Sequence, residues 1–305
     1  MDWLLDPLQH RFAARALVVA LLLGVSGGLV GCVLLLRRLA LLADAFGHAL
    51  LPGVGLAYLL AGPSLPALAG GACVAGLLTA SASALVARGT RLKEDAAFGA
   101  LFVICFAAGA ALLSKVAAPT DLLHYLFGHV LGLTRADLIL AAMVSAGTVL
   151  AVALFQRPLV LDCFDQAFHR ASGGRSALTH LLVLGLVVVN LVAALQAVGM
   201  VLSLGLFLLP AATAYLWCER FTAMLWFSAV YGAVGAMGGF YLSYYADLNS
   251  GASMVLCLGS GFILSALFSP THGLFGRRRQ SHRHQREDSE DTCAVPTVPD
   301  PARSH

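Results

Sequence analysis

The sequence predicts an all-α protein, a bundle of helices that crosses a membrane many times. Hydrophobic residues make up 59% of the 305 residues and charged residues 11%, with a mean hydropathy of +0.84. Predominantly apolar runs of about 18 residues or more recur along most of the chain, and a helix of that length spans the hydrocarbon core of a bilayer. Lysine and arginine lie between these runs and in the C-terminal tail. Their placement indicates membrane topology rather than a nucleic-acid surface.

Nine apolar segments are expected to cross the membrane, and together they make residues 1–275 one transmembrane domain. Polar or proline-containing stretches separate most of them. Gly199 and Met200 alone separate two of them, which predicts either two tightly joined helices or one broken helix. The nine segments are Ala16–Leu36, Leu39–Leu60, Leu65–Ala87, Ala96–Ser114, Ala136–Phe155, Leu178–Val198, Val201–Trp217, Ala223–Tyr244 and Ala252–Phe268.

The positions of lysine and arginine predict the orientation. With the N-terminus outside, fifteen of these residues lie on the cytoplasmic side and four on the outer side. The positive-inside rule favours this arrangement, which also places the C-terminus in the cytoplasm. The four outer residues are Arg11, Arg15, Lys115 and Arg135.

The second segment carries an aspartate and a histidine, Asp44 and His48, at a spacing that puts both on one face of a helix. A carboxylate inside a membrane span is costly and marks a functional site by default. Carboxylate oxygen and imidazole nitrogen suit Zn, Mn or Fe(II), whereas Cu(I) prefers sulfur. We interpret the pair as ligands of a transported divalent metal, completed by other helices or a second copy. The alternative is a hydrogen-bonded Asp–His pair that only packs helices.

Two further features of this segment support the metal interpretation. Pro52 cannot donate to the carbonyl of His48, so a kink beside the candidate ligands is expected. Small residues at Ala45, Ala49, Gly53 and Ala57 form a stripe that allows close helix contacts, which predicts a central helix. The seven cysteines include no C-x-x-C pair, so we expect no thiolate metal site.

Two shorter stretches lie between the predicted crossings. Lys115–Arg135 is expected to form a short helix at the outer face, where His124 and His129 are either interfacial side chains or an outer gate for the metal. Arg157–Ser176 is expected to form a cytoplasmic helix with Leu161, Phe164, Phe168 and Ala171 on its apolar face and Asp162 on the polar one. Its spacing does not decide between the lipid surface and a groove in a partner.

The C-terminal residues 276–305 are rich in charge, proline and serine and lack apolar periodicity, so we expect a disordered cytoplasmic tail. His282 and His284 within it are interpreted as part of a solvated tail rather than a metal site. The chain contains no G-x-x-x-x-G-K-[ST] motif, and no H-E-x-x-H or G-x-S-x-G motif. If ATP drives transport, another chain must therefore bind it.

Five stretches together resemble one known family, the permease subunits of ATP-binding-cassette importers for zinc, manganese or iron. DAFGHALLPGVGLA, at Asp44–Ala57, resembles the family's second-helix region. LLHYLFGHVL, at Leu122–Leu131, resembles its outer segment, and FDQAFHRASG, at Phe164–Gly173, its cytoplasmic coupling helix. Val198–Ala214 and Leu242–Leu256 resemble its later helices. The resemblance covers about residues 16–268.

The resemblance implies a pore subunit of a bacterial plasma (inner) membrane importer, not itself an enzyme. It implies Asp44 and His48 as metal ligands, with zinc or manganese ahead of iron as the cargo and no resident cofactor. The implied partners are two copies of an ABC ATPase subunit, a second permease copy, an extracytoplasmic metal-binding protein and membrane lipid. The residues implied to couple to the ATPase are Leu161, Phe164, Asp165, Phe168, Ala171 and Gly173.

Two other functions remain compatible with the residues alone. A secondary metal transporter or channel, driven by protons that titrate Asp44 and His48, needs no ATPase. A membrane scaffold in which the same pair only locks helices needs no cargo. The three functions differ in whether metal moves, and in whether ATP is needed to move it.

Overall fold

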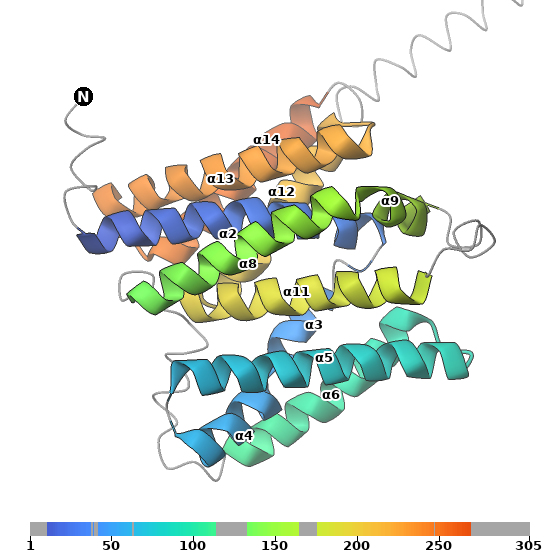
Figure 1. Cartoon of the computed structure of the whole chain (residues 1–305). Coiled ribbons are helices and arrows are strands. Elements are labelled where there is room, and N and C mark those ends of the chain that lie inside the picture. Colours follow the sequence, from blue (N-terminus) through green and yellow to red (C-terminus); the bar gives the residue numbers. More distant parts are fainter. Residues whose placement is uncertain are drawn as a thin grey trace, which may run out of the picture.

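The computed structural model describes residues 11–37, 39, 42–62, 64–113, 133–164, 176–246 and 248–269. Within these ranges the regular structure is α-helical (Figure 1). The helices in chain order are α2 (Arg11–Leu36), α3 (Leu42–Ala49), α4 (Leu51–Ala61), α5 (Leu65–Gly89), α6 (Glu94–Leu113), α8 (Arg135–Leu154), α9 (Gln156–Phe164), α11 (Ser176–Val198), α12 (Met200–Trp217), α13 (Phe221–Ala246) and α14 (Ser250–Phe268).

These helices confirm the predicted fold class. Eight helical stretches in the described part of the chain are long and apolar enough to cross a membrane, with α3 and α4 together forming one of them. The ninth predicted segment is α12, which is apolar but shorter. Some predicted features lie outside the described residues. They are the outer segment with His124 and His129, the residues Asp165, Phe168, Ala171 and Gly173, and the tail with His282 and His284.

Helices α11 and α12 meet at one residue, Gly199. Its backbone has φ 82° and ψ 176°, a conformation open essentially only to glycine. The Gly199 N–H donates to the carbonyl of Leu195, and the Gly199 carbonyl accepts from the N–H of Ser203, both at 3.1 Å. Backbone hydrogen bonds therefore continue up to the join from both sides. Of the two expected alternatives, the structure has two tightly joined helices.

Helix α2 is the centre of one group of helices, in which it packs against α8, α11, α12 and α13 (Figure 1). Its contact with α13 runs along residues that lack bulky side chains. A Cβ atom on Gly24 would lie 2.7 Å from the carbonyl oxygen of Gly232, and one on Gly28 would lie 2.8 Å from that of Ser228. Without a hydrophobic effect in lipid, such close backbone contact is a main source of helix association. The pair α2 and α13 therefore forms a tightly packed frame.

A second group contains α4, α5 and α6, and α11 lies between it and α2 and α8 (Figure 1). Gly53 of α4 faces Gly71 of α5, where an added Cβ atom would collide with the opposite backbone. The small-residue stripe thus makes a close contact, as expected. Its predicted central location does not hold for the second half of α4, where Leu56, Leu59 and Leu60 are 50%, 50% and 79% exposed. The first part of the segment lies further inward: α3 packs against α11 and α12, and Leu51 and Val54 at the start of α4 are buried.

Candidate functional site

Helix α3 presents Asp44 and His48 on the same side and anchors itself with the other. Ala43, Phe46 and Ala49 are buried, and the ring of Phe46 packs against Phe98 of α6 with 4.3 Å between the ring centroids. Asp44 is exposed and His48 is half-buried. Because the buried residues fix the rotation of the helix, the two polar side chains are held together on another face, where Asp44 is exposed and the ring of His48 lies beside α6.

Two aromatic side chains of α6 flank the imidazole of His48. The ring centroid of His48 lies 5.9 Å from that of Phe102 and 5.5 Å from that of Phe106, and the ring planes of His48 and Phe106 are nearly perpendicular, at 87°. Edge-to-face contacts of this kind restrict how a ring can turn. Neither phenylalanine was predicted as part of the site, because in an apolar span such residues are indistinguishable from lipid-facing ones. Their spacing of four residues was the available signal.

The helix that carries the candidate ligands is broken rather than bent. α3 ends at Ala49 and α4 begins at Leu51, with Pro52 in the first turn of α4. The N–H groups of Gly53 and Val54 both donate to the carbonyl of Leu50 at 3.1 Å, so the new helix starts at once. Proline fits a first turn because it has no N–H to donate. The predicted disruption beside His48 is therefore present, in the form of two short helices.

The described residues contain no group of three His, Cys, Asp or Glu side chains placed to hold one metal ion. Asp44 and His48 thus offer two ligands from one helix, and the assignment of this pair as a metal site stays a prediction. Two protein ligands are fewer than a closed structural site uses. Since Asp44 is exposed, its carboxylate is accessible to groups outside this chain.

The predicted cytoplasmic helix is only partly described, and it differs from expectation in two respects. It begins earlier, since α9 starts at Gln156, and its buried residues are Leu159 and Asp162 rather than the apolar face expected from spacing. Leu161 is half-buried and Phe164 is 68% exposed. Asp162, which was predicted on the polar face, is buried rather than exposed. The predicted apolar face is therefore the more exposed side of α9 in the described residues.

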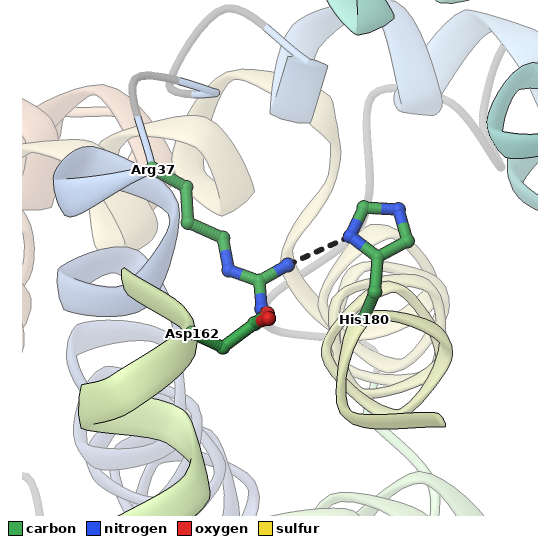
Figure 2. Close-up of polar contacts among 3 residues, drawn as sticks. All are labelled: Arg37, Asp162 and His180. Atoms are coloured by element: carbon green, nitrogen blue, oxygen red, sulfur yellow. Dashed lines mark hydrogen bonds and ion pairs between the residues drawn. The ribbon is translucent and has the colours of Figure 1, made fainter. Parts of the chain in front are cut away.

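Asp162 is buried because it forms an ion pair with Arg37, at the end of α2 (Figure 2). Arg37 also donates from Nη1 to Nδ1 of His180 on α11, at 2.8 Å. Next to Asp162, burial raises the pKa of the Cys163 thiol, and the neighbouring Arg37 guanidinium opposes this shift. In the sequence Arg37 indicated only topology and His180 lay in an apolar run, so neither was recognised as part of a polar cluster.

Comparisons with known proteins give consistent results. Residues 9–269 match the profile described as the ABC 3 transport family. The manganese transport system membrane protein MntC of Halalkalibacterium halodurans is 39% identical over 271 residues, which cover 88% of this chain and 91% of that protein. A probable iron transport system membrane protein of Haemophilus influenzae is 33% identical over 268 residues, covering 88% and 97% respectively.

A solved structure is also similar over most of the chain. PsaBC from Streptococcus pneumoniae, determined in complex with Fab, contains a chain that superposes with a TM-score of 0.78 at 32% sequence identity. The match covers 88% of this chain and 96% of that chain. The helix arrangement in Figure 1 is thus similar to that of an experimentally determined membrane protein.

Proposed function

This chain belongs to the ABC 3 transport family, and from that membership and the display of Asp44 and His48 on α3 we propose that it is the permease subunit of an ATP-driven importer for a divalent transition metal. The observation that carries the proposal is the pair itself: a carboxylate and an imidazole on the exposed side of a broken membrane helix. An ionisable pair in such a location is expected to serve transport rather than packing.

Manganese is the favoured cargo, followed by iron. Similar proteins carry manganese or iron in their names. A hard carboxylate with a borderline imidazole accepts both ions, and Zn as well. Zinc as a cargo is predicted only by the residue types and by the family resemblance. The uptake experiment described below therefore includes Zn(II).

We further propose the partners that such a subunit needs. An ABC ATPase would dock on the face of α9 that carries Leu161 and Phe164 and on the residues that follow, and a separate protein would deliver the metal from outside. A second permease copy would supply the ligands missing beside Asp44. The orientation with the N-terminus outside is supported by Arg37, Lys93 and Arg157, which lie at helix ends that alternate crossings bring to one side.

Reconstitution into liposomes tests the function. The chain is purified with its ATPase, and uptake of Mn(II), Fe(II) and Zn(II) is measured with and without ATP. We expect ATP-dependent uptake, with Mn(II) fastest. Uptake by the chain alone without ATP would instead identify a secondary transporter or channel. The double variant Asp44→Leu with His48→Leu tests the scaffold alternative. A protein in which the pair only packs helices should keep its function with two leucines, whereas a metal path should lose uptake.

A further inference from the structure

The buried cluster of Arg37, Asp162 and His180 joins three elements at one end of the bundle (Figure 2). Arg37 follows the last turn of α2, Asp162 lies on α9, and His180 lies near the start of α11. The side chains of Arg37 and Asp162 are 3% and 0% exposed, and His180 is 7% exposed. Three ionisable side chains from segments far apart in sequence are thus removed from water together.

The guanidinium is the centre of this cluster because it can only donate. Arginine has no acceptor atom, so Nδ1 of His180 accepts the hydrogen bond and the ring carries its hydrogen on Nε2. The Nη2 atom of the same planar group pairs with Oδ2 of Asp162. One rigid group therefore binds α9 through a charge and α11 through a directed hydrogen bond, which fixes the position of α9 relative to two membrane helices.

A buried ion pair fixes the relative positions of the segments that it joins, but it often adds little to the free energy of folding. Removing two charges from water is costly, and well-packed apolar residues in the same place are often equally stable. Fold stability alone therefore gives no reason to place charges here. Each helix also leads to a different part of the molecule: α2 contacts α12 and α13, and α11 contacts α3, which carries Asp44 and His48.

We propose that Arg37 is a positioning residue that transmits movement between the ATPase-docking segment and the metal path, by holding α9 to the ends of α2 and α11. The inference rests on the proposed function, because it assigns the docking segment to α9 and the residues after it. When a bound ATPase displaces this segment, the cluster carries the displacement to α11 and, through their contact, to α3. Without the cluster, α9 would remain joined to α8 through Phe155, but α2 and α11 would no longer follow its movement.

The test replaces the ion pair by apolar residues, Arg37→Met with Asp162→Leu, in the complete transporter with its ATPase in liposomes. Metal uptake and ATP hydrolysis are measured together. We expect normal assembly and continued ATP hydrolysis, with at least a fivefold fall in metal moved per ATP. Ser145→Ala is the matched control, because it removes a hydrogen bond of 3.0 Å between α8 and the Leu22 carbonyl of α2 without touching the cluster. Its ratio should equal that of the wild type.

An unchanged ratio in the double variant overturns the inference and leaves the proposed function intact. A wild-type complex that moves no metal with ATP overturns the proposed function, and the inference falls with it. If the double variant fails to assemble, His180→Leu and His180→Gln decide. The inference requires a lower ratio in His180→Leu that His180→Gln restores, since glutamine retains an acceptor; equal ratios in the two variants overturn it.

Discussion

Two polar clusters of this membrane protein differ in what surrounds them. Arg37, Asp162 and His180 are buried and bind one another across three helices. Asp44 and His48 lie on one short helix, with the carboxylate exposed. Ionisable residues in a membrane protein are expensive in both places. The difference teaches that charged groups paired with one another inside the fold hold helices in position, whereas an exposed carboxylate is available to a ligand.

The largest expected effect on folding is that of Arg37→Met alone. It leaves the buried carboxylate of Asp162 without its guanidinium, which typically costs about 3–5 kcal/mol. Thermal unfolding of the purified protein in detergent measures the change. Adding Asp162→Leu to the same protein should recover most of the stability. An Arg37→Met protein as stable as the wild type would mean that water reaches this cluster, and the contrast between the two clusters would disappear.

Asp44→Ala should behave in the opposite way. Because Asp44 is exposed, we expect the free energy of unfolding to change by no more than about 0.5 kcal/mol. Metal uptake in the reconstituted transporter should nevertheless fall to background. Unfolding and uptake measured on the same preparation separate the two effects. A strongly destabilised Asp44→Ala protein would show that Asp44 has a structural role, like the buried cluster, rather than a role as a ligand.

Phe106→Ala tests whether the aromatic contact orients His48 for metal binding. Loss of the ring that contacts His48 should let the imidazole turn, and changes in groups that orient a ligand lower metal affinity by about tenfold or more. Metal dependence of the ATP-driven uptake rate measures this as a higher half-saturating concentration. Ile104→Ala is the control, since Ile104 is 65% exposed and lies on the opposite side of α6. Equal shifts in both variants would assign the effect to the helix rather than to the His48 contact.

Among substitutions of buried polar groups, a small effect is expected for Thr148→Val, which removes a neutral buried contact and should leave metal uptake unchanged. The Asn190 Nδ2 atom donates to Thr148 Oγ1 at 2.6 Å, between α11 and α8. Such hydrogen bonds between membrane helices contribute about 0.6 kcal/mol on average. Thermal unfolding should therefore show a loss several times smaller than for Arg37→Met. A loss of stability as large as that of Arg37→Met would mean that leaving a buried charge unpaired costs no more than removing a neutral hydrogen bond.

The sequence by itself determined the membrane helices and the location of the candidate site. Lipid cannot hydrogen-bond to a backbone, so long apolar runs must become helices. Hydropathy placed their ends to within about five residues, as for α2, which begins at Arg11 rather than Ala16. Asp44 and His48 share a face because four residues make about one helical turn. Local chemistry also set the two irregular points, since Pro52 has no N–H and Gly199 adopts a positive φ.

Only the tertiary structure decided which polar groups are buried and against what. The spacing in α9 placed Asp162 on the polar face, but it could not show that this face is buried against Arg37, which comes from a distant part of the chain and pairs with Asp162. The contact of Phe102 and Phe106 with His48 likewise depends on how α6 packs against α3. Periodicity in the sequence shows which residues share one face of a helix. What that face contacts is decided by the packing of the helices against one another.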